Sequence, residues 1–167
     1  IFMKIYQKGD KKLLNAWAFY DWANSVYSLV IGTAVFPLYY SNITEGATVS
    51  FLGTTWEHPD TLYSYALSFS FLVVAFMSPI LSAIADYTGN KKRFLQIFCW
   101  IGSLSVMSLY FFDGIDTVWI GIVFTVLASI GFWSSIVFYN AYLPEVAFPK
   151  DQDRVSAKGF ILGYLGS

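Results

Sequence analysis

Residues 62–93 read LYSYALSFSFLVVAFMSPILSAIADYTGNKKR, an apolar stretch that passes directly into a short basic turn. The apolar part, residues 62–85, is long enough for a helix to cross the hydrocarbon core of a bilayer. The turn carries Lys91, Lys92 and Arg93, and short loops that stay in the cytosol retain Lys and Arg. We therefore expect a transmembrane helix that ends at a cytosolic turn.

The basic residues repeat this pattern along the whole chain. All ten Lys and Arg residues fall in three clusters, at residues 4–12, 91–93 and 150–158, and long apolar stretches separate the clusters. The loops in between carry acidic residues instead, around residues 45–60 and 113–116. Because translocated short loops are depleted of cations, the pattern predicts a chain that starts in the cytosol, crosses the membrane four times and returns. The N-terminus is thus predicted to be cytosolic.

The apolar stretches predict four transmembrane spans, at about residues 16–40, 62–85, 94–112 and 117–139. As a helix the first span is ~37 Å long, more than the ~30 Å hydrocarbon core, and Pro37 is expected to mark its outer end. Gly89 permits a sharp reversal, so Gly89 and Asn90 are expected to form the tight turn between the second and third spans. The predicted fold is an all-α integral membrane protein.

The composition agrees with a membrane protein and excludes other classes. The chain is 56% hydrophobic and 13% charged, with a mean hydropathy of +0.55, which is far more apolar than a globular domain. Nucleic-acid binding is not expected, because the cations are confined to one predicted side of the membrane rather than forming a stripe on a folded surface. The single Cys99 excludes an internal disulfide and a multi-cysteine metal site. No metal and no cofactor are expected.

A fifth apolar segment begins near residue 156 and runs to the last residue. About ten apolar residues cannot cross a bilayer, and a helix that ended in hydrocarbon would leave its last carbonyl groups unsatisfied. We therefore expect the 167 residues to be part of a longer protein. The alternative is a short helix that lies in the membrane interface, with Lys158 at its head.

Polar side chains inside the first span are candidates for function, because such groups are costly in lipid and normally face a bundle interior or a water-filled cavity. Helical spacing places four of them on one face: Asp21, Asn24, Ser25 and Ser28. This stripe is expected to face into the bundle. Asp21 either binds a cation or a proton at the cytosolic mouth of a pathway or is a helix-entry carboxylate that pairs with nearby lysines.

The fourth span has a second polar face, on which Trp133 and Asn140 lie with Ser129. Asn140 is near the inner end of the span and is predicted to meet the same cavity as Asp21. Solute contact and simple packing are equally good explanations of this face.

The basic turn after residue 85 also contains charged residues that could form a gate. Asp86 precedes Gly89 by three residues, and its carboxylate can form reversible ion pairs with the cations that follow. The stretch from Ser82 to Arg93 resembles the signature loop of the major facilitator superfamily, Gly-x-x-x-Asp-x-x-Gly-x-basic-basic, with Ser82 in place of the first glycine. A plain cytosolic turn would explain the cations, though not the positions of Asp86 and Gly89.

Three further segments resemble the vacuolar amino-acid effluxer branch of that superfamily, which includes the autophagy-related permeases and their bacterial relatives. They are YDWANS at residues 20–25, FYNAYLP at 138–144, and DRVSAKG at 153–159 with GYLG at 163–166. The resemblance covers nearly the whole chain. It implies about twelve helices in two six-helix bundles, of which this chain would be four helices and the start of the fifth in the N-terminal bundle. It also implies efflux of amino acids or similar small solutes, and a missing C-terminal half of the same protein as partner.

The sequence therefore predicts a fragment of a secondary active transporter that works by alternating access, in contact with the lipid bilayer and a small-molecule solute. A bacterial cytoplasmic membrane is favoured over a vacuolar membrane. The rival interpretation is a four-helix membrane scaffold or assembly subunit without transport activity. A membrane-embedded enzyme is the weakest interpretation, because the spans contain no His and only one acidic residue clearly inside an apolar stretch.

Overall fold

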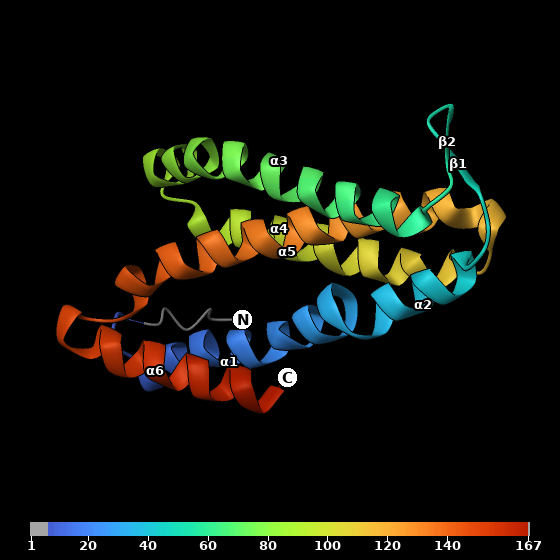
Figure 1. The fold of residues 1–167 in the computed structure, drawn as a ribbon. Helices are drawn as coiled ribbons and strands as arrows, with labels where there is room; N and C mark the ends of the chain where they lie inside the picture. Colours follow the sequence, from blue (N-terminus) through green and yellow to red (C-terminus); the bar gives the residue numbers. More distant parts are fainter. Residues whose placement is uncertain (1–6, 167) are drawn as a thin grey trace, which may run out of the picture.

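The computed structural model describes residues 7–166, which form a bundle of long helices that run along one common direction (Figure 1). The helices are α1 (Lys11–Tyr27), the π-helical segment η1 (Ser28–Thr33), α2 (Val35–Thr44), α3 (Pro59–Thr88), α4 (Lys91–Ser108), α5 (Val118–Val146) and α6 (Pro149–Gly166). Two short 3₁₀ turns, η2 (Leu109–Phe111) and η3 (Ile115–Thr117), join α4 to α5.

Four helical stretches among the described residues are long and apolar enough to cross a membrane. They are Lys11–Thr44, Pro59–Thr88, Lys91–Phe111 and Ile115–Val146. This confirms the predicted all-α membrane fold with four long apolar helices. Each of these stretches extends beyond the apolar run predicted for it at one or both ends, and α6 begins at Pro149, ahead of the apolar segment predicted near residue 156. The difference arises because caps and turns, rather than hydropathy, decide where a helix ends.

Local signals explain several of the helix ends. The Asp10 side chain accepts a hydrogen bond from the Lys12 backbone N–H at 2.9 Å, which caps the start of α1. α3 starts with Pro59 at its first position, where a missing N–H does no harm. α3 ends at Gly89, whose φ of 65° is left-handed and therefore favours glycine over residues with a Cβ. The chain then turns through Asn90 into α4, so the turn between the second and third spans lies where the sequence predicts it.

The first span is interrupted rather than ended near Pro37. Its regular α-helical pattern stops at Ser28, passes through η1 and restarts as α2 at Val35. Pro37 therefore lies in the first turn of α2, where the helix needs no backbone N–H from it, and α2 continues to Thr44. The prediction that Pro37 marks the outer end of the span is wrong, because the upstream π-helical break gives this proline a permitted position.

The loop between the first two spans contains a small β-hairpin that the sequence pattern did not predict. β1 (Val49–Phe51) pairs antiparallel with β2 (Thr54–Trp56). The two turn residues, Leu52 and Gly53, have φ values of 52° and 77°, as the preferred two-residue hairpin turn requires. Val49 is buried in an apolar cluster with Tyr40, so the hairpin is anchored to this end of the bundle.

The described residues of all three basic clusters lie at the opposite end of the bundle, on the left in Figure 1. We call this the basic end. α1, α4 and α6 start there, and α3 and α5 end there. The charge separation that the sequence shows along the chain is therefore also a separation in space.

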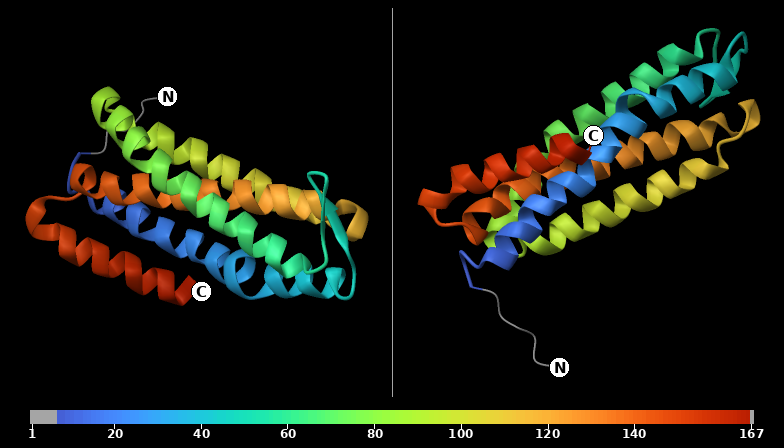
Figure 2. Two further views of the ribbon diagram at one scale, coloured as in Figure 1. Left: turned by 45° about the horizontal axis from the view of Figure 1, so that its top comes forward. Right: turned by 90° about the horizontal axis from the view of Figure 1, so that it is seen from below.

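α5 is the central helix of the bundle and packs against α4, α3 and α1 (Figure 2). It approaches α4 closely at Gly131, where an added Cβ would lie 2.5 Å from the backbone N of Gly102. α1 packs along α6 on the other side, and both helices start from the basic end. This pairing of the first and last helices of the chain positions the candidate site.

Candidate functional site

Three of the predicted site residues line one small pocket between α1 and α6. The pocket has a volume of about 200 Å³ and is lined by Asp21, Ser25, Ser28, Phe160, Gly163 and Tyr164. Asp21 and Ser25 lie in α1 and Ser28 begins η1, and their spacing of four and three residues places the three polar side chains on one side of the helix. Gly163 lets α6 approach this side closely, since a Cβ there would lie 3.2 Å from Oδ2 of Asp21.

The hydroxyl groups in this pocket are oriented by the helix itself. Ser25 Oγ donates to the carbonyl of Trp22 at 2.8 Å, and Ser28 Oγ donates to the carbonyl of Ser25 at 2.8 Å. Each hydroxyl proton is therefore in use, while the lone pairs of each oxygen remain available as acceptors. The two serines thus offer acceptors, rather than donors, to anything that enters the pocket.

The carboxylate of Asp21 is half-buried and makes no ion pair or hydrogen bond with another of residues 7–166. Lys158, on the neighbouring helix, instead donates to Oδ1 of Asn15 at 2.6 Å. The predicted alternative, in which Asp21 pairs with nearby lysines, therefore has no ion pair to support it in the described part of the chain. A carboxylate without a partner in a pocket is a functional candidate.

Tyr139 is a neighbour of this site that the sequence pattern did not single out. Its ring stacks on Trp17 at 4.2 Å between centroids, and its carbonyl accepts from Trp17 Nε1 at 3.0 Å. The side chain is only 5% exposed, yet its hydroxyl has no hydrogen-bond partner among the described residues. A Cβ added at Gly159 would lie 3.0 Å from the Tyr139 hydroxyl and 3.5 Å from Asp21 Oδ2. Both polar groups therefore face the same part of α6, where Gly159 has no side chain.

The other predicted contact residues lie elsewhere. Asn24 lines a second pocket of about 320 Å³, on the side of α1 that faces α4 and α5, because one residue along a helix turns the side chain by about 100°. The ring of Trp133 packs at a tilt of 58° against Phe71 of α3, with 5.6 Å between centroids. Asn140 is exposed and lines neither of these two pockets. The structure therefore does not bring these three side chains together with Asp21.

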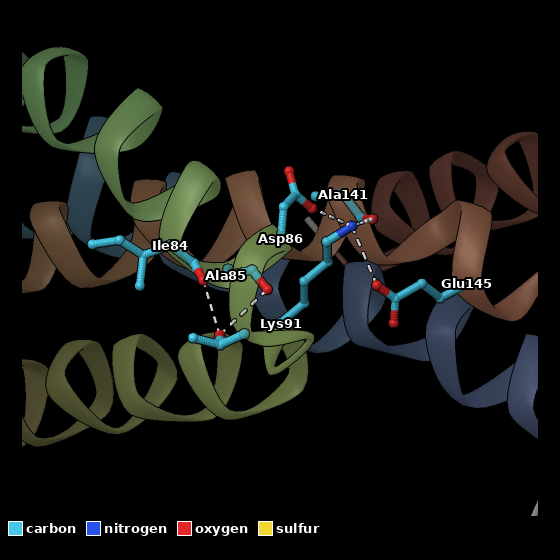
Figure 3. A network of polar contacts seen from close by, with 7 residues as sticks. Ile84, Ala85, Asp86, Lys91, Ala141 and Glu145 are labelled. Atoms are coloured by element: carbon cyan, nitrogen blue, oxygen red, sulfur yellow. Dashed lines mark hydrogen bonds and ion pairs between the residues drawn. The ribbon is translucent and has the colours of Figure 1, made fainter.

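A cluster of ion pairs joins three helices at the basic end (Figure 3). Lys91 Nζ lies 2.7 Å from Oδ1 of Asp86 and 3.2 Å from Oε1 of Glu145, and it donates to the carbonyl of Ala141 at 3.4 Å. Asp86 is near the end of α3, Lys91 starts α4, and Glu145 is near the end of α5. A single ammonium therefore connects the ends of α3, α4 and α5, and we call this cluster the Lys91 junction.

Of the charged residues predicted to form the gate loop, only Asp86 and Lys91 take part in the described ion pairs of the junction. Lys92 and Arg93 are exposed and have no ion pair or hydrogen bond through their side chains to other described residues. Glu145, which completes the junction, was not predicted because it is 54 residues from Lys91 in the chain. The Asp86 side chain is 62% exposed and that of Glu145 is 41% exposed, so each pair contributes about 0 to 1 kcal/mol and can break and re-form.

No group of three or more His, Cys, Asp or Glu side chains that could hold a metal ion occurs within residues 7–166. The site that the structure does assemble is an unpaired carboxylate with hydroxyl acceptors between two helices. Such an arrangement can accept hydrogen bonds from a polar group.

Comparisons with known proteins agree with a membrane transporter. The model of a family described as vacuole effluxer Atg22 like matches residues 9–152. The uncharacterized MFS-type transporter YxiO of Bacillus subtilis is 41% identical over 153 residues, which are 92% of this chain and 34% of YxiO. Autophagy-related protein 22 of Gibberella zeae is 39% identical over 80 residues, which are 48% of this chain and 12% of that protein. No solved structure matches the chain.

The chain thus spans about a third of the length of YxiO and a smaller share of the fungal protein. The family match covers most of the chain, and it agrees with the four long apolar helices of the described residues. The family description names an effluxer, and YxiO is named as a transporter of the MFS type. The chain belongs to the vacuole effluxer Atg22-like family of major-facilitator membrane transporters.

Proposed function

We propose that this chain is part of a secondary transporter that exports amino acids or similar small solutes by alternating access. The observation that carries the proposal is the Lys91 junction, in which one ammonium links the ends of three helices through water-exposed pairs. Such contacts can hold one arrangement of helices and release it at small cost. That is the requirement for a contact that closes one side of a transporter and opens again.

We further propose that the basic end is the cytosolic end, in a bacterial cytoplasmic membrane. The retention of Lys and Arg at this end supports that orientation, and the relation to YxiO of Bacillus subtilis supports the bacterial membrane. In this orientation the Lys91 junction acts as a cytosolic latch, and the pocket at Asp21 lies between the latch and the centre of the bilayer. The solute reaches the pocket from the cytosol when the latch is open.

The pocket of Asp21, Ser25 and Ser28 is the proposed contact site for the solute within this chain. Asn24 belongs to a different pocket, and Trp133 lies on the side of α5 that faces α3. Contacts of Asn24, Trp133 and Asn140 with the solute stay predictions. They require a solute path that is wider than the α1–α6 pocket.

The test is solute efflux from proteoliposomes that contain the protein at its full natural length. The liposomes are loaded in turn with each of the standard amino acids in radiolabelled form, and efflux is compared with that from protein-free liposomes. We expect saturable efflux of at least one amino acid, accelerated by unlabelled solute on the other side. A folded, monodisperse protein that moves none of them would contradict amino-acid export and favour the scaffold interpretation.

The latch is tested in the same assay with a matched pair of substitutions. Lys91→Gln removes the ammonium from the junction, whereas Lys92→Gln removes an exposed neighbouring cation that the junction does not use. We expect Lys91→Gln to change the rate of efflux severalfold and Lys92→Gln to leave it unchanged. Equal effects of both changes would mean that the turn acts only through its overall positive charge.

A further inference from the structure

The pocket between α1 and α6 presents hydrogen-bond acceptors and negative charge on its polar side. Asp21 supplies a carboxylate, and Ser25 and Ser28 supply oxygen lone pairs because their protons are donated to backbone carbonyls. Of the described residues that line the pocket, none is a lysine, an arginine or a histidine. A carboxylate group of a solute would therefore meet the charge of Asp21 with no cation to balance it.

Tyr139 adds a second polar group at the same seam. Its hydroxyl is buried and has no partner within the described residues, which is a costly arrangement unless something binds there. The positions of Gly159 and Gly163 leave the backbone of α6 without side chains where it passes Tyr139 and Asp21. Both oxygens therefore lie against the same stretch of α6, beside the pocket that Asp21 lines.

We propose that the seam formed by Asp21, Tyr139 and the two glycines of α6 binds the primary ammonium group of the transported solute. An ammonium carries three donors and a positive charge, which match one carboxylate, the serine oxygens and one phenolic oxygen. Phe160 also lines the pocket, and aromatic faces attract ammonium groups. This inference rests on the proposed function, in which the pocket contacts the solute, and adds the chemical group that the pocket recognises.

A bound metal ion fits the seam less well. Ca²⁺ takes six to eight oxygen ligands and Mg²⁺ requires an octahedral set, whereas Asp21 is the one carboxylate among the described residues that line the pocket. An ammonium is satisfied by three acceptors and tolerates varied geometry. Because the described lining offers hydrogen-bond acceptors, one carboxylate and no cation, it favours a cationic nitrogen group over both a metal ion and an anion.

The experiment measures binding rather than transport, so that its failure is distinct from failure of the proposed function. The full natural protein is purified in detergent, and its melting temperature is measured against increasing alaninamide or propionamide. The two amides differ only by the amine, and ligand binding to the folded state raises the melting temperature by mass action. We expect saturable stabilisation by alaninamide and none by propionamide.

Three substitutions locate the binding. Asp21→Asn is expected to raise the dissociation constant for alaninamide about tenfold or more, because a charge-assisted hydrogen bond is lost. Tyr139→Phe removes only an unpaired hydroxyl, so the fold is kept and the constant is expected to rise about threefold. Asp116→Asn, a change of an exposed carboxylate in the turn before α5, serves as the matched control and is expected to leave the constant unchanged.

Several outcomes would overturn the inference. Equal responses to alaninamide and propionamide on the unaltered protein would exclude recognition of the amine, and this comparison needs no variant. Unchanged alaninamide binding in Asp21→Asn would place the amine elsewhere. Stabilisation by Na⁺ that depends on Asp21, without any by alaninamide, would identify a metal-ion site instead. If the amine binds but no amino acid is exported, the inference about binding holds and the proposed function fails.

Discussion

The ammonium of Lys91 lies 3.2 Å from the carboxylate of Glu145, which ties the start of α4 to the end of α5. The same ammonium lies 2.7 Å from Asp86 near the end of α3. Lys91 is thus shared by two carboxylates, and its side chain is only 17% exposed, although both partners are open to solvent. Loss of either carboxylate leaves the other pair in place, whereas loss of Lys91 removes both.

Asp86→Asn is expected to keep the fold and to shift the resting population toward the state that is open at the basic end. One exposed ion pair contributes at most about 1 kcal/mol, so the shift should be about fivefold or less. The measurement is the labelling rate of single cysteines placed along the halves of α1 and α5 nearest the basic end, in a Cys99→Ala background. Glu145→Gln should act in the same direction. Unchanged labelling and transport in both variants would mean that the turn only sets the orientation of the chain in the membrane.

The predicted orientation can be checked with two exposed positions at opposite ends of the bundle. Asn90 lies in the turn at the basic end and Thr55 lies in the hairpin. In right-side-out vesicles, a membrane-impermeant thiol reagent should label a cysteine at Thr55 and not one at Asn90, again in a Cys99→Ala background. Labelling at Asn90 alone would invert the topology, and permeabilised vesicles show that both cysteines can react.

Gly131→Ala should destabilise the bundle, because its Cβ would lie 2.5 Å from the backbone N of Gly102. Overpacking of this kind typically costs about 1 to 3 kcal/mol, and backbone atoms yield less readily than the end of a flexible side chain. The readout is thermal unfolding in detergent. Gly114→Ala is the control, since nothing lies within 4 Å of its Cβ position and its backbone is extended. Similar melting temperatures for both variants would contradict the close approach of α4 and α5.

Leu52→Gly should stabilise the hairpin modestly, despite removing a large apolar side chain. Leu52 is 89% exposed and has a left-handed φ of 52°, a conformation that costs a residue with a Cβ about 1 to 2 kcal/mol. Glycine removes this cost, although the more flexible unfolded chain offsets part of the gain. Leu52→Ala keeps the Cβ and should not stabilise. Hydrogen exchange of the β1 and β2 amides measures the difference, and equal protection in both variants would refute the prediction.

Much of the fold could be predicted from sequence because its signals are local. The four long helices follow from unbroken apolar runs, and the end of α3 follows from the conformational freedom of Gly89. The π-helical break at η1 was not predicted, although Gly32 lies within it, because an isolated glycine is tolerated inside a regular helix and does not specify a break. The hairpin was missed because its strands are three residues each, too short for a clear alternation.

The candidate site likewise has some features that could be predicted from the sequence and others that could not. Helical spacing predicts from sequence that Asp21, Asn24, Ser25 and Ser28 share a helix face, and the structure brings all of them except Asn24 into one pocket. Tertiary packing, in contrast, brings this face against α6, places Tyr139 beside it with a hydroxyl that has no partner among the described residues, and adds Glu145 to the Lys91 junction. These contacts join residues far apart in the chain, and they depend on how closely helices approach one another. That approach is set by the packing of glycines such as Gly163 against a neighbouring helix, a property of two surfaces together that neither stretch of sequence contains alone.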